Sequence, residues 1–111
     1  EAIKIFENDR FGEVRVAGTS ENPLFCLADV CKILDNPVLD LINSGKITVR
    51  RLTDAPIRIG VTDSIGREQQ MNFVNEKNLY KVIMRSDKPQ AEPFQDWVCG
   101  EVLPSIRKHG A

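Results

Sequence analysis

Five apolar residues recur at helical spacing near the end of the chain. They stand at relative positions i, i+3, i+4, i+8 and i+12, and on a helix this pattern forms one continuous stripe. The five residues are Phe94, Trp97, Val98, Val102 and Ile106. A stripe of this length is stable only when another layer covers it, so we expect a long last helix with Phe94 and Trp97 in the core. Pro104 should kink that helix, because proline removes one backbone donor and clashes with the carbonyl four residues back.

The first part of the chain predicts a hairpin, a buried strand and two helices. Residues 3–6 and 14–16 have the alternating, β-branched character of short strands, and they flank a turn over 8–12. The apolar run 24–27 is predicted as a buried strand that leads directly into a helix ending near Leu34. A second short helix is predicted between an N-cap at Asn36 and Gly45.

Those two helices resemble a helix-turn-helix in spacing only. A recognition helix offers Arg, Lys, Asn or Gln to the base edges from its leading turns. Here the second helix offers Asp40 and apolar residues. The pattern therefore argues against insertion of this helix into a DNA groove.

The middle of the chain predicts an antiparallel meander with one polar face. Its strands are expected over residues 46–52, 56–62 and 67–74, with a tight turn at 63–66. Alternation places one set of side chains inward and another toward solvent. The second strand carries Ile57, Ile59 and Val61 on one face and Arg58 and Thr62 on the other. In the third strand Met71 and Phe73 point inward, and Gln70 and Asn72 point outward.

Two capping patterns mark the helices of the last third. Asn75 is expected to cap a helix whose apolar face carries Leu79, Val82 and Ile83. Asp87 and Gln90 have the spacing of a capping box, with Pro89 in the first turn of the last helix.

Together the patterns predict an α+β fold: an antiparallel sheet, made of a hairpin and a meander, packed by about four helices, the last kinked at Pro104. A length of 111 residues fits one domain, residues 1–111.

The charge is nearly balanced over the whole chain but unevenly distributed. The net charge is −1, which excludes a polycationic nucleic-acid binder. Residues 1–45 hold four basic and eight acidic side chains, whereas residues 46–111 hold eleven and eight. Any contact with phosphate groups should therefore come from the second part. The DNA-binding candidates on the middle strands are Lys46, Arg50, Arg51, Arg58 and Arg67.

Each basic group has a plain structural interpretation beside the functional one. The middle strands could form a basic ribbon on a duplex, or simply a solvated polar face. Arg107 and Lys108 could contact phosphate groups, or compensate the dipole of the last helix. Arg85 and Lys88 could offer charge to an acidic protein partner, or form a capping turn. The residues alone leave these alternatives open.

The sequence gives little support for a catalytic site, a cofactor site or a metal site. The single histidine, His109, lies near the end of the chain, and neither glycine-rich phosphate motif occurs. Cys26, Cys31 and Cys99 lack the spacing of a zinc site, so we expect buried free thiols in a reducing, cytoplasmic compartment. Asp29, Asp35 and Asp40 are interpreted as capping and dipole carboxylates. We expect a binding module with no cofactor and no metal, and no membrane span, since the longest apolar run is residues 24–28.

Four segments in this order resemble the Bro-N domain, the N-terminal module of BRO-family proteins and prophage antirepressors. The resemblance implies a small α+β module followed by a variable C-terminal domain. It also implies a role in transcription regulation, through duplex DNA, through capture of a phage repressor protein, or both. Homo-oligomers fit this expectation, as does a chain that is the N-terminal piece of a longer protein. The four segments are residues 24–31, 74–80, 84–91 and 94–108, the last without 99–100.

Overall fold

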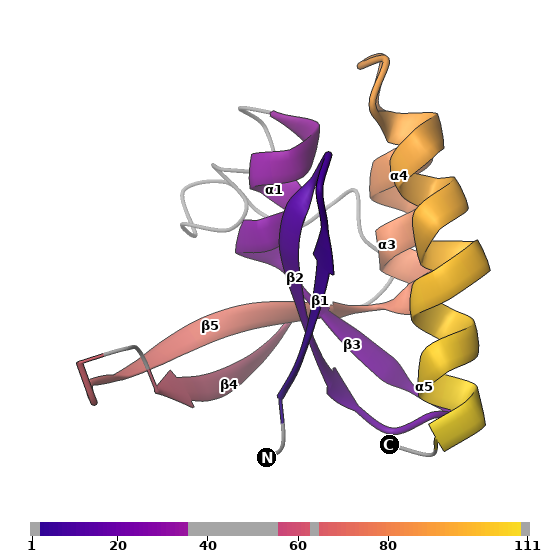
Figure 1. The fold of residues 1–111 in the computed structure, drawn as a ribbon. Helices are drawn as coiled ribbons and strands as arrows, with labels where there is room; N and C mark the ends of the chain where they lie inside the picture. The colour runs from indigo at the N-terminus through magenta and orange to yellow at the C-terminus, as the bar shows by residue number, and fades with distance from the viewer. Residues whose placement is uncertain (1–2, 36–55, 63–64, 110–111) are drawn as a thin grey trace.

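The fold is a five-stranded antiparallel sheet with helices packed on one face (Figure 1). A computed structural model describes residues 3–35, 56–62 and 65–109. The strands follow the order β1-β2-β3-β5-β4 across the sheet. They are β1 (Lys4–Asn8), β2 (Gly12–Gly18), β3 (Pro23–Cys26), β4 (Ile57–Thr62) and β5 (Glu68–Asn75). The α+β class and the antiparallel pairing predicted from the sequence are confirmed.

Three helical units are present in the described part of the chain. The predicted helix over 36–45 and the predicted strand over 46–52 lie outside the described residues. The third unit is one long bent helix in three sections. The helices are α1 (Leu27–Leu34), α3 (Glu76–Met84), and the successive sections α4 (Ala91–Trp97), η1 (Val98–Val102) and α5 (Leu103–His109).

Local side-chain bonds fix two of the predicted boundaries. The Asn8 side chain accepts hydrogen bonds from the backbone N–H groups of Arg10 and Phe11 at 2.8 and 3.2 Å, which closes the turn between β1 and β2. The Asn75 side chain accepts from the N–H of Asn78 at 2.9 Å. This bond satisfies one of the free donors at the start of α3, so the predicted N-cap is confirmed.

The main core lies between the sheet and the helices. Phe25 of β3 and Phe94 of α4 are fully buried in it, and Trp97 is 7% exposed. Phe11, from the first turn, packs edge-on against Phe94, with ring centroids 5.7 Å apart at 73°. This edge-to-face arrangement is favourable for aromatic pairs and joins the first hairpin to the last helix. The predicted core position of Phe94 and Trp97 is confirmed.

A second, smaller cluster covers the opposite face of the sheet. Its centre is Phe73 of β5, which is fully buried, with Cys26 of β3 and Ile59 of β4 beside it. Ile3 and Met71 are only partly buried at its rim. The β4–β5 pair therefore has apolar support on this face as well, with Ala28 of α1 packed against the cluster.

The last helix accommodates Pro104 through a π-helical turn. The N–H of Leu103 donates to the carbonyl of Val98, five residues back, at the end of η1. The wider turn makes room where the ring of Pro104 would clash with the carbonyl of Gly100. The predicted disruption at Pro104 therefore occurs as a bulge in the turn just before the proline.

Two predictions near this helix are wrong. α4 begins at Ala91, and Gln90 makes no side-chain cap, so the Asp87–Gln90 capping box does not form. Instead Gln90 Nε2 donates to the carbonyl of Ile33 at 3.2 Å, because the last carbonyls of α1 lack helical partners. Cys99 is exposed, in contrast to the buried Cys26 and Cys31, and all three are free thiols.

Candidate nucleic-acid interface

The β4–β5 pair extends beyond the rest of the sheet as a two-stranded arm (Figure 1). Of the residues of β5, only Phe73, Val74 and Asn75 pair with β3. Residues 68–72 of β5 pair, among the described strands, with β4 alone. At about 3.4 Å per residue, this part of the arm is about 17 Å long. A pair of strands of this kind fits the major groove of B-DNA.

The arm has an apolar and a polar face, as the alternation predicted. The apolar face carries Ile59, Met71 and Phe73 into the second cluster. The register places Arg58 opposite Asn72 and Thr62 opposite Glu68 on the other face. The polar face consists of Arg58, Thr62, Glu68, Gln70 and Asn72.

Two arginines stand on the arm, and in the sequence Asp63 and Glu68 balance their charge. Arg58 and Arg67 are both exposed, Arg58 on β4 and Arg67 just before β5. The Glu68 carboxylate accepts a long hydrogen bond from Gln70 Nε2 at 3.4 Å. It lies over Gly60, where an added Cβ would overlap it. Because Gly60 has no side chain, the Glu68 carboxylate can lie close to the strands at this position.

The remaining predicted site residues do not join the arm into one stripe. Arg107 and Lys108 are exposed near the end of α5, and Arg107 Nη2 pairs with Glu76 Oε1 at 3.1 Å. Arg85 and Lys88 lie in the turn between α3 and α4, at the other end of the last helix. Lys46, Arg50 and Arg51 lie outside the described residues. Of the seven DNA-binding candidates, Arg58 and Arg67 lie on the same hairpin, near its opposite ends.

The turn that carries Lys88 is mixed in charge. A shallow hollow of about 500 Å³ lies there, and Lys88 lines it together with Asp87, Glu92 and Asp96. Three carboxylates beside one ammonium group leave no excess of positive charge in this hollow. Charge alone therefore does not mark it as a site for an acidic partner.

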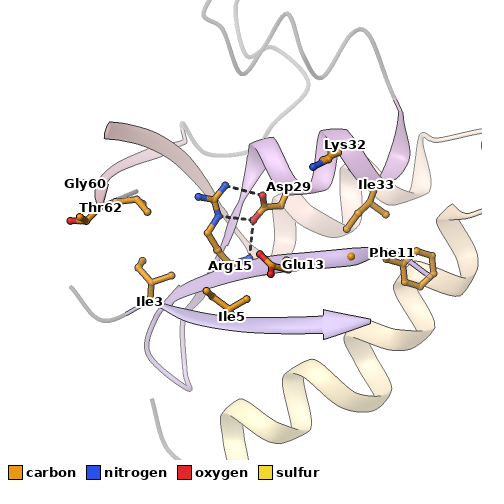
Figure 2. A pocket seen from close by; sticks show the side chains of 12 residues that line it. Ile3, Ile5, Phe11, Glu13, Arg15, Asp29, Lys32, Ile33, Gly60 and Thr62 are labelled. Carbon is orange, nitrogen blue, oxygen red and sulfur yellow. Dashed lines mark hydrogen bonds and ion pairs between the residues drawn. The ribbon is translucent and has the colours of Figure 1, made fainter. Parts of the chain in front are cut away.

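A groove of about 980 Å³ lies beside the arm, between β1, β2, β4 and the first helix (Figure 2). Ile3 and Ile5 line one side, and Gly60 and Thr62 of the arm line another. The only ion pair drawn in it joins Arg15 of β2 to Asp29 of α1. The groove therefore offers apolar strand surface around a charge pair that is already formed.

Arg15 donates three hydrogen bonds to the Asp29 carboxylate, a contact that the sequence did not reveal. Its Oδ2 accepts from the Arg15 backbone N–H at 2.9 Å and from Nε at 3.0 Å, and its Oδ1 accepts from Nη2 at 2.9 Å. The hydrogen bonds to Asp29 raise the pKa of Arg15, against the opposing effect of burial. Asp29 still lies in the first turn of α1, as its dipole interpretation requires. Its main partner, however, is fourteen residues away in sequence.

Comparison with known proteins settles the family. The model of the BRO family, N-terminal domain, matches residues 13–104. The chain belongs to this family. The match runs from β2 into α5, so it includes the whole arm. No solved structure matches the chain.

Relatives of this Bro-N domain occur in a bacterium and in large viruses. An uncharacterized protein of Haemophilus influenzae is 43% identical over 86 residues, which cover 78% of this chain and 40% of that protein. The putative Bro-N domain-containing protein 201R of Invertebrate iridescent virus 6 is 32% identical over 100% of this chain and 30% of its own length. Protein 019R of Invertebrate iridescent virus 3, named in the same way, is 34% identical over 88% and 28%. The chain thus spans well under half the length of these relatives.

Two described side chains of the Bro-N domain, Cys26 and Tyr80, have raised pKa values. Burial raises the pKa of the Cys26 thiol, which therefore stays protonated and poorly nucleophilic at neutral pH. Burial and the contact with Cys99, whose Sγ lies 3.4 Å from the hydroxyl, raise the pKa of Tyr80. No cluster of three metal-ligating side chains occurs within residues 3–35, 56–62 and 65–109. In those same ranges no helix is long and apolar enough to cross a membrane.

Proposed function

We propose that this Bro-N domain is a DNA-binding module of a transcription regulator of the prophage antirepressor type, and that it contacts the duplex with the β4–β5 arm. The family is associated with DNA-binding regulatory proteins of phages and is of a regulatory rather than an enzymatic type. The observation that carries the proposal is the arm itself. It extends past β3, and exposed Arg58 and Arg67 lie near its two ends.

The chemistry of the polar face suits a duplex. Arginines at the root and near the tip of the arm can neutralise phosphate groups, which supplies affinity without sequence preference. On β5, Gln70 lies between them and Asn72 lies opposite Arg58, and amide side chains can read base edges, adenine in particular.

The test is the salt dependence of duplex binding by the Arg58→Ala, Arg67→Ala double variant. Each lost phosphate contact lowers the slope of log affinity against log salt by about 0.9, so we expect the slope to fall by about 1.8. Fluorescence anisotropy with a labelled duplex between roughly 50 and 200 mM salt measures the slope. The Lys77→Ala, Lys81→Ala double variant removes the same charge from α3 and serves as the control, with no change expected. Equal effects of the two variants would show that the arm is not the contact surface.

The alternative is a module that captures a phage repressor protein without touching DNA. The net charge of −1 and the scattered positions of Arg85, Lys88, Arg107 and Lys108 favour it. Copurification with a phage repressor at high salt, with no duplex binding at low salt, supports this alternative. Duplex binding that depends on the arm excludes it.

A further inference from the structure

One large apolar side chain stands exposed in the connection at the end of the arm. Ile65 is 70% exposed, and it lies between β4 and β5. Gly66 follows it with φ 85°, a left-handed conformation that L side chains rarely adopt. Arg67 comes next along the chain and is exposed as well.

Position distinguishes Ile65 from the other exposed apolar residues of the described chain. Single exposed apolar side chains are common and need no special explanation. Ile5 and Ile57 are 56% and 48% exposed, and both lie on sheet strands. Met84 is 77% exposed at the end of α3. Ile65 alone among these four combines exposure with the end of an element that extends from the sheet.

We propose that Ile65 acts as an apolar wedge that inserts at a base step of the duplex and kinks it. The inference rests on the proposed function, because the arm must first lie in a groove. The arm extends about 17 Å past β3, whereas the grooves of B-DNA are about 8 Å deep, so its tip can reach the stacked bases.

The surroundings of Ile65 fit a wedge on DNA. Proteins that kink DNA commonly push an Ile, Leu, Phe, Met or Pro side chain between base pairs and recover the cost of unstacking through contacts to the bent duplex. Arg67, two residues after Ile65, is placed to meet a phosphate group beside the opened step. Pyrimidine–purine steps unstack most easily, so the wedge predicts a preference for TA and CA steps without any hydrogen bond to a base.

The experiment measures bending and affinity separately. A duplex carries a donor and an acceptor dye at its ends, and the energy transfer between them is recorded with and without the chain. We expect the wild-type chain to raise the energy transfer and Ile65→Ala to abolish the rise. The same variant should bind about tenfold more weakly, because buried methyl and methylene groups are lost. Its salt slope should stay unchanged, since no phosphate contact is removed.

Two further variants keep the result interpretable. Ile65→Leu keeps an apolar side chain of the same size and should bend the duplex as the wild type does. Met84→Ala removes an equally exposed apolar side chain from α3 and should change neither bending nor affinity. All three variants should melt at the wild-type temperature, because both positions are exposed.

The outcomes separate the wedge from the proposed function. A chain that binds the duplex with a salt slope dependent on Arg58 and Arg67, yet bends it equally with Ile65→Ala, refutes the wedge alone. Absence of duplex binding by the wild type at low salt refutes both. Unchanged bending together with a change in the sedimentation of Ile65→Ala would assign Ile65 to contact with a second copy, and would also overturn the wedge.

Discussion

Removal of the Asp29 carboxylate should destabilise the domain far more than removal of the Glu76 carboxylate, which pairs with exposed Arg107. Asp29→Ala leaves the Arg15 guanidinium and the Arg15 backbone N–H without their three hydrogen bonds. The two side chains are 27% and 13% exposed, so the site lies between a surface pair and a buried pair. Surface pairs contribute about 0 to 1 kcal/mol, and breaking a buried pair costs about 3 to 5 kcal/mol. We therefore expect a loss of about 2 to 3 kcal/mol for Asp29→Ala.

Urea denaturation measures this loss against a matched control. With an m value of about 1.5 kcal/mol per molar, the midpoint should fall by roughly 1.3 to 2 M at unchanged m. The control is Glu76→Ala, which removes the 3.1 Å ion pair with Arg107, whose side chain is 56% exposed. It should cost less than about 1 kcal/mol.

A double-mutant cycle with Arg15→Ala separates the interaction free energy of Arg15 and Asp29 from the effect of Asp29 on the dipole of α1. A coupling energy of about 2 kcal/mol is expected for contacting charged groups with several hydrogen bonds. The reasoning is refuted if the coupling is near zero, or if Asp29→Ala costs no more than Glu76→Ala.

Two other perturbations test the local structure. Asn75→Ala removes the bond to the N–H of Asn78 and should lower the unfolding free energy by about 1 kcal/mol in urea denaturation; no loss would mean that the cap is dispensable. Because burial raises the pKa of Cys26, its thiol ionises in the unfolded chain before it ionises in the folded one, so its contribution to stability is full at neutral pH and falls as the pH rises through the ordinary thiol pKa of 9.0. Thermal melts across this range should show the fall, and Cys26→Ala should make it shallower; an equally steep fall in that variant would contradict the assignment.

Features set by local spacing could be predicted from the sequence. The two faces of β4 and β5 follow from residue alternation, which placed Arg58 outward and Phe73 inward. The cap at Asn75 follows from its position just before an amphipathic segment. In both cases the relevant partners lie within a few residues or on the adjacent strand of a hairpin.

Features set by distant partners could not be predicted. Arg15 meets Asp29 across fourteen residues, and Gln90 meets the carbonyl of Ile33 across 57 residues. The second contact overrides the local capping pattern, because an unsatisfied helix carbonyl is a better partner in the folded chain than the sequence neighbour. The basic residues showed the same limit, since their spacing gave no sign that Arg107 would pair with Glu76.

The proposed role of the arm also depends on a partner outside the chain. An exposed arginine on a strand has the same local pattern whether it is solvated or bound to a phosphate group. Only a complex distinguishes the two states, and the geometry of β4 and β5 indicates where in the chain the difference should be seen.

A titration of the isotopically labelled chain with a short duplex, followed by amide NMR spectra, tests this role most directly. The account predicts that the largest shift changes fall on residues 57–62 and 65–72, with small changes along α3 and α5. Changes concentrated on the helices, with the arm unaffected, would contradict it.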